Sequence, residues 1–172
     1  MSPYTQMINQ LATELAAGLA ADYPNLEVFK MAFRASNIPD FQRYGIVVSP
    51  AARPLEEKVV GVRNVQYVCR ADIYLLVKNF SETDSLFGTA TSGFGLFEMI
   101  EDVKDLIRLT TLGGLLDKTY AEAAGDPTQG GGGPVEFEDS AAAGFDSGGK
   151  SFVRRARLPF VGRMIPFCHA KV

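Results

Sequence analysis

Few side chains in this sequence are suited to nucleophilic, general-base or soft-metal chemistry. Its 172 residues include two cysteines, Cys69 and Cys168, and one histidine, His169. Catalysis by a serine or cysteine requires a base within hydrogen-bond reach, and the residues around His169 form no such arrangement. Zinc sites use about four ligands, usually in closely spaced pairs, whereas Cys69 lies far from the Cys168-His169 pair in the sequence. We therefore expect no catalytic residue, no cofactor and no metal ion.

The glycine-containing stretches do not form a nucleotide-binding motif. Gly93-Phe94-Gly95 precedes a predicted helix, as a phosphate-binding loop would. It lacks the third glycine of the dinucleotide fingerprint and the Gly-Lys-Ser/Thr of a nucleotide-binding loop. A flexible entry to the helix is the simpler interpretation, and the glycine run at 130–133 is interpreted as a linker.

Two adjacent segments near the C-terminus carry opposite charge. Ala121–Gly149 contains eight glycines and six acidic residues without a lysine or arginine, and Lys150–Val172 contains six basic residues without an acid. The first cannot bury enough apolar surface to fold alone, which predicts a long loop or arm, with a short strand at Val135-Glu136-Phe137. The basic residues have two interpretations: pairing with the acidic segment, in the same subunit or the next, or contact with nucleic acid. Because only Phe152 and Phe160 offer aromatic stacking surfaces there, we favour the acidic segment.

The element that must position these residues is a long strand at Val65–Asn79. Its odd-numbered residues, Cys69 among them, are all suited to a core, and its even-numbered residues are mostly polar. This period of two predicts a β-strand with one buried face, on which Cys69 is a core thiol. The strand would span roughly 50 Å, more than one small core covers. Apolar Val68, Tyr74 and Leu76 on the opposite face therefore predict that this face is partly buried against another chain.

The remaining elements predict an α+β fold, with two helices packed on one face of a mainly antiparallel sheet of long strands, plus a long Gly-rich acidic loop. Ser2 as N-cap and Pro3 at the first helical position begin a helix of about five turns. A second helix follows Ser92, with Leu96, Met99, Ile100, Val103, Leu106 and Ile107 as its apolar stripe. Strands are predicted at Leu26–Phe33, Gly45–Ser49 and in the C-terminal segment, where Pro159 requires an edge or a bulge. Pro50–Lys58 and Phe80–Thr91 are predicted connections.

Composition sets wide limits. The length fits one domain, residues 1–172 with 121–149 as an insert, and 47% hydrophobic residues suffice for a core. A net charge of −3 gives no general attraction to nucleic acid or membranes. No apolar run reaches the ~20 residues that span a bilayer, and the first ten residues lack the layout of a signal peptide. We expect a reduced, cytosolic setting.

The order of these elements resembles that of the tail terminator proteins of long-tailed bacteriophages. The resemblance lies in the opening helix, a short strand ending in a loop (IVVSPAARP), the long central strand (VQYVCRADIYLLV), the next helix (LFEMIEDVKDLIRL) and the extended final strand (RRARLPFVGRMIPF). It covers most of the chain except Ala121–Gly149 and is a pattern of elements rather than a signature motif. Head–tail completion and connector proteins share much of this plan.

The resemblance implies a structural virion protein rather than an enzyme. It implies a ring, usually a homohexamer, that is made in the host cytoplasm, caps the tail tube, ends tube polymerisation and joins the tail to the head. The implied partners are other copies, the tail tube protein and a head-completion or connector protein, with DNA only passing through the lumen and no membrane. The alternatives are a head-completion or connector (neck) protein of the same particle, and a small non-viral α+β ligand-binding domain. An enzyme is the third alternative for the function.

A closed ring needs two different patches on each subunit that meet head to tail. The acidic 121–149 and basic 150–163 segments are candidates for these patches. The predicted interface residues are Val68, Tyr74, Leu76, Arg154, Arg155, Arg157 and Arg163.

Overall fold

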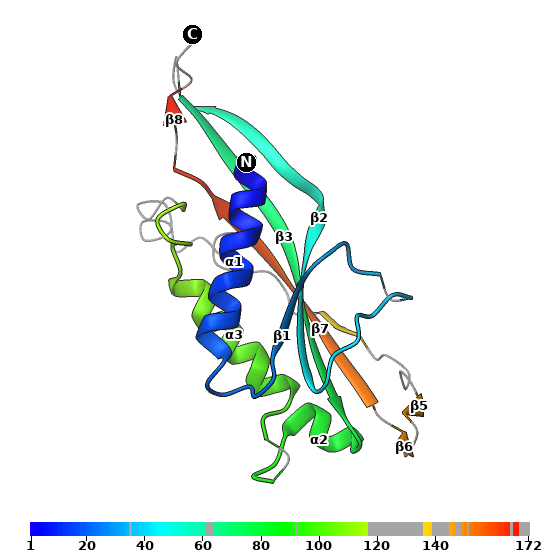
Figure 1. The fold of residues 1–172 in the computed structure, drawn as a ribbon. Helices are drawn as coiled ribbons and strands as arrows, with labels where there is room; N and C mark the ends of the chain where they lie inside the picture. The colour runs from blue at the N-terminus through cyan, green and yellow to red at the C-terminus, as the bar shows by residue number, and fades with distance from the viewer. Residues whose placement is uncertain are drawn as a thin grey trace.

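The protein is an α+β domain in which helices cover one face of a long, twisted sheet (Figure 1). The computed structural model describes residues 1–34, 36–60, 64–91, 93–116, 136–138, 145–146, 149–150, 152–165 and 167–168. The sheet has the strand order β1-β2-β3-β7-β4, with β8 also pairing with β3. The pairings are antiparallel except for β1 with β2, which is parallel. The predicted fold class is confirmed; most of the acidic loop lies outside the described residues.

Three strands dominate the sheet. These are β2 (Tyr44–Val60), β3 (Asn64–Asn79) and β7 (Phe152–Arg163), with β3 in the centre. The shorter strands are β1 (Glu27–Lys30), β4 (Glu136–Glu138) and β8 (Phe167–Cys168), while β5 (Phe145–Asp146) and β6 (Gly149–Lys150) form a separate pair. The prediction of long antiparallel strands is therefore confirmed at both Val65–Asn79 and the C-terminal segment.

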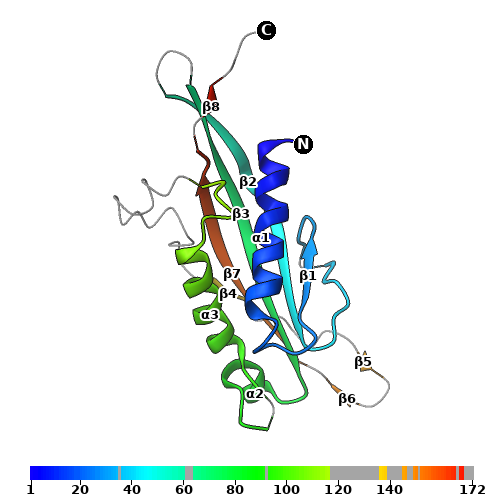
Figure 2. The same ribbon diagram turned by 60° about the vertical axis from the view of Figure 1, so that its left-hand side comes forward.

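The two predicted helices form and supply the core. Helix α1 (Pro3–Leu19) begins as predicted, because the Ser2 side chain accepts a hydrogen bond from the Thr5 backbone at 3.1 Å. Helix α3 (Leu96–Leu109) has Gly95 as its N-cap, whose N–H donates to the Glu98 side chain at 3.0 Å; the predicted cap, Ser92, lies outside the described residues. Both helices lie on the same face of the sheet (Figure 2).

The core lies between these helices and the odd-numbered face of β3. Its largest fully buried side chains include Met7, Leu11 and Leu15 of α1, Met99 of α3, Ile73 and Leu75 of β3, and Phe160 of β7. Gly18 allows the two helices to approach closely, since an added Cβ would lie 2.8 Å from the Leu106 side chain. The amphipathic spacing in the sequence thus fixes which face of each helix is buried.

Two predicted connections are ordered elements. The region Phe80–Thr91 contains a short helix, α2 (Glu82–Phe87), capped by Ser81, whose side chain accepts from the Asp84 backbone. The region Pro50–Lys58 belongs to β2, with a register shift between Pro50 and Leu55. Strand β1 pairs with β2 only as far as Val48. Beyond that residue β2 pairs with β3 alone among the described strands. Its other edge therefore needs no backbone N–H donor, and the strand tolerates two prolines there.

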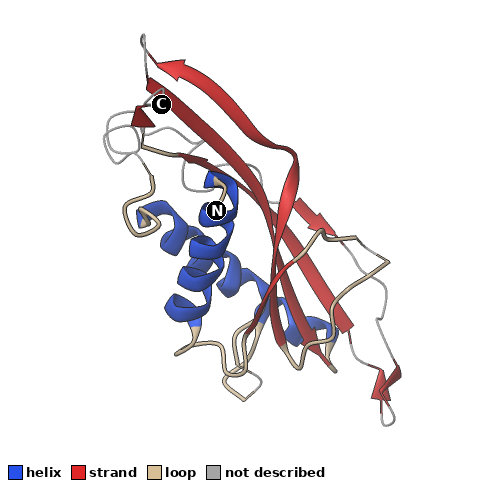
Figure 3. Ribbon diagram, turned by 45° about the horizontal axis from the view of Figure 1, so that its top comes forward, coloured by secondary structure: helices blue, strands red, loops and turns tan. Residues whose placement is uncertain are grey.

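A second, smaller core lies on the sheet face away from the helices. It contains Phe41, Val47, Leu76 and Val153, with Phe29, Met31, Phe33, Ile38 and Tyr74 packed around them. The connection between β1 and β2 runs over this side of the sheet (Figure 3). This face is therefore covered by the chain itself around Tyr74 and Leu76 of β3.

Candidate subunit interface

The structure brings the predicted interface residues of β3 and β7 side by side. In the antiparallel register, Val68 lies opposite Arg163, Tyr74 opposite Arg157 and Leu76 opposite Arg155. Directly opposed residues of an antiparallel pair share one face of the sheet, which here is the face away from the helices. We call Arg155, Arg157 and Arg163 with their three β3 neighbours the arginine face. Arg154 lies opposite Val77 and so belongs to the helix-covered face.

Val68, Tyr74 and Leu76 were predicted to be buried against another chain, and for two of the three this prediction is wrong. Leu76 is 0% exposed and Val68 2% exposed within the single chain, so neither has surface left to bury. Tyr74 is half-buried and stacks on Phe33, with ring centroids 4.1 Å apart. For Leu76 and Tyr74 the reason is the β1–β2 connection, which folds back over the sheet and packs against them; Val68 lies between its strand neighbours Glu56 and Arg163.

Arginine side chains line the same face and are half-buried. The Arg157 guanidinium lies 3.1 Å from the Asp72 carboxylate, and the Asp72 side chain is 11% exposed. The Arg155 guanidinium lies over the Phe33 ring, 5.8 Å from its centroid. Sequence reasoning missed Asp72 as a partner, although the only acid of a half-buried strand is a signal that a cation lies nearby.

A second ion pair lies further along the face and is more exposed. The Arg70 guanidinium donates to Glu56 at 2.7 Å, with exposed fractions of 32% and 45% for the two side chains. This hydrogen bond lowers the pKa of the Glu56 carboxyl from its usual value. Charges on this face are thus matched locally, and the pair near the sheet centre is the more buried of the two.

The acidic insert meets the arginine strand inside one subunit. Strand β4 pairs antiparallel with β7, placing Glu136 opposite Arg157 and Glu138 opposite Arg155. The prediction of a short strand near Val135–Phe137 is confirmed, with its bounds at Glu136–Glu138. The register brings an acidic strand beside the basic strand within the subunit; that their charged side chains pair stays a prediction. Whether it extends to a neighbouring chain stays a prediction, and the rest of 121–149 falls outside the described residues apart from β5 and the first residue of β6.

The end of the β2–β3 hairpin extends past α1 (Figure 1). We call residues 55–60 and 64–69 the distal hairpin; its strands pair from Leu55 with Cys69 to Val60 with Asn64. Every residue from Leu55 to Val59 is exposed, and Val59 is 76% exposed. Apolar side chains on an exposed strand are the surfaces that strand-to-strand association uses.

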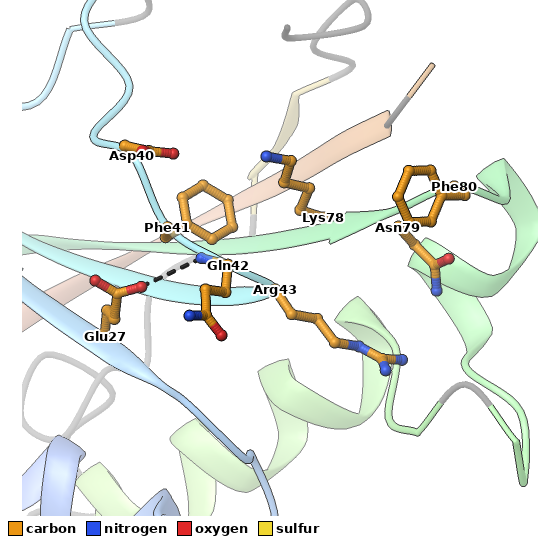
Figure 4. A pocket seen from close by; sticks show the side chains of 8 residues that line it. All are labelled: Glu27, Asp40, Phe41, Gln42, Arg43, Lys78, Asn79 and Phe80. Atoms are coloured by element: carbon orange, nitrogen blue, oxygen red, sulfur yellow. Dashed lines mark hydrogen bonds between the residues drawn. The ribbon is translucent and has the colours of Figure 1, made fainter. Parts of the chain in front are cut away.

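A hollow of about 610 Å³ lies near α2, where β1 and β2 begin and β3 ends. It is lined by Glu27, Asp40, Phe41, Gln42, Arg43, Lys78, Asn79 and Phe80. Its polar groups do not converge: in Figure 4, Lys78 points to one side of the strands, and Gln42 and Arg43 point to the other. The Glu27 carboxylate accepts a hydrogen bond from the Gln42 backbone at 3.2 Å. A small-molecule site needs polar groups that meet on one ligand, and this hollow does not provide them.

The residues with nucleophilic or metal-binding chemistry do not come together. Burial raises the pKa of the Cys69 thiol to about 11, and its side chain is fully buried in the core. Cys168 pairs with Asn64 through β8, and His169 lies outside the described residues. Within the described ranges, no three histidine, cysteine or acidic side chains are grouped to hold a metal ion. No helix in the same ranges is both long and apolar enough to cross a membrane.

Comparison with known proteins leaves the family open. No protein-family model matches the sequence. No curated protein matches it either.

Proposed function

We propose that this chain is a structural virion protein that forms a ring on the end of a phage tail tube. We expect the ring to be a hexamer. The ring stops tube growth and joins the tail to the head, and no enzyme activity is proposed. The observation that carries the proposal is the distal hairpin, whose end extends past α1 and whose β2 strand exposes Leu55 and Val59, 42% and 76% exposed. A strand pair that overruns its own core is suited to bury its end against another chain.

The charge arrangement supports the same proposal. Head-to-tail contact requires two unlike surfaces on each subunit. The exposed β2 side of the distal hairpin, Leu55–Val59, is one, and the arginine face with its edge strand β4 is the other. Strand β4 pairs with β7 through three residues. The head-completion or connector role is the nearest alternative, since it uses the same ring architecture.

Mass measurement and electron microscopy of the purified protein test the proposal. We expect a concentration-dependent assembly with a mass close to six subunits, seen as a ring with a central opening. Val59→Asp should disperse this assembly without changing the melting temperature, because Val59 is exposed and lies outside both cores. Val59→Thr is the matched control, since it keeps the β-branched shape and should assemble. A protein that stays a single subunit at high concentration, with and without tail tubes, contradicts the proposal.

A further inference from the structure

Exposed phenylalanines gather at the end of the molecule that carries α2. Among the described side chains, the exposed phenylalanines are Phe80, Phe87, Phe94 and Phe97, all within one stretch of the sequence. Phe87 and Phe97 lie 5.2 Å apart between ring centroids, and Phe94 lies 5.5 Å from the ring of Tyr23. We call Phe87, Phe94 and Phe97 the aromatic platform. Single exposed apolar residues are ordinary on a protein surface, but a contiguous aromatic group marks a binding surface.

The backbone holds the aromatic platform in place. Gly88 and Gly93 adopt positive φ values of 64° and 77°, and Thr89 and Gly93 exchange backbone hydrogen bonds of 3.0 and 2.8 Å. The Tyr44 hydroxyl donates to the Phe94 carbonyl at 2.8 Å. A surface that is already ordered loses little conformational entropy when a partner binds.

Carboxylates surround the platform. Two adjoining hollows, of about 690 and 450 Å³, share Asp22, Phe94 and Glu98. The second hollow is also lined by Glu101 and Asp102. These four acids outnumber the nearby cations, which are Arg43 in the first hollow and Lys104, whose ammonium lies 3.2 Å from Glu101. The platform therefore combines aromatic faces with excess negative charge.

We propose that the aromatic platform binds a basic, partly apolar segment of a partner protein. Arginine or lysine side chains of the segment lie on the phenylalanine faces and meet the carboxylates, and apolar side chains between them fill the two hollows. A second copy of this chain fits this chemistry poorly. Its arginine-rich strand β7 is half-buried in the sheet, and Arg157 is paired with Asp72. The surface lies apart from the distal hairpin and the arginine face, so the inference does not depend on the proposed ring.

Peptide binding measured by fluorescence anisotropy tests this inference. The probe is a labelled peptide of alternating arginine and leucine, compared with one carrying glutamate for arginine and one carrying serine for leucine. We expect the first to bind most tightly. Phe97→Ser and Glu101→Gln should each weaken its binding about tenfold or more, while Glu57→Gln, an exposed acid of the distal hairpin, should not. Glu101 is exposed, with its side chain 69% exposed, so that variant keeps the fold even if Phe97→Ser does not.

Three results would overturn the inference. The first is equal affinity for the arginine–leucine peptide in the Glu101→Gln and Glu57→Gln proteins. The second is equal binding of the glutamate peptide. The third is a wild-type assembly that Glu101→Gln disperses to single subunits, which would assign the platform to a second copy.

Discussion

The Arg157–Asp72 ion pair should stabilise the fold far more than the Glu56–Arg70 pair, although the second has the shorter contact, 2.7 Å against 3.1 Å. The reason is burial. Removing Arg157 leaves the Asp72 carboxylate, only 11% exposed, without its cation in a poorly solvated site. Breaking a fully buried pair costs about 3–5 kcal/mol. Since the Arg157 side chain is 31% exposed, we expect about 2 kcal/mol.

Arg157→Met removes the charge and keeps an apolar stem of similar length. Urea unfolding followed by circular dichroism should show a loss of about 2 kcal/mol, with a melting temperature lower by about 4–8 °C. Combining this change with Asp72→Asn in a double-mutant cycle isolates the pair, and we expect a coupling of about 1 kcal/mol or more. Arg70→Met is the matched control and should leave the stability nearly unchanged, because its partner Glu56 is exposed.

The reasoning fails if the two arginine variants lose equal stability. It also fails if the cycle gives no coupling, since the cost of Arg157→Met would then come from packing alone.

Three further changes test other parts of the structure. Gly88→Ala should cost about 3 kcal/mol in thermal unfolding, because φ is 64° and an added Cβ would lie 2.3 Å from a backbone oxygen; Gly114→Ala, with open space around its Cβ, should cost clearly less. Burial raises the pKa of Cys69 from 9.0 to about 11, so the unfolded chain loses its proton first. The contribution of the Cys69 thiol to the free energy of unfolding is therefore fully present below pH 9, and about 2–3 kcal/mol of it is lost as the pH rises to 11. In urea titrations at different pH values, Cys69→Ala should remove this loss. Replacing Glu136 and Glu138 with glutamine should reduce the salt dependence of the melting temperature; an unchanged salt dependence would show that the acids of β4 do not act on the arginine face.

Local side-chain patterns determined much of the fold. The Ser2-Pro3 start of α1, the apolar stripe of α3 and the period of two in β3 each depend on residues within a few positions of one another. Caps and side-chain periods act over that range, which is why these elements could be predicted. The same logic failed at Phe80–Thr91, where a polar composition concealed the Ser81 cap of α2 and Phe87 of the aromatic platform.

Only the tertiary structure decided which segments of the chain cover each face of the sheet. The period of two places Val68, Tyr74 and Leu76 on one face, but it does not say what covers that face. The β1–β2 connection packs Phe33 on Tyr74 and helps to enclose Leu76, so Leu76 has no surface left for an interface and Tyr74 has little. Strand register likewise set Arg157 beside Asp72 and Glu136. These contacts join residues far apart in the chain, and their energies depend on burial, which no local pattern of residue types contains.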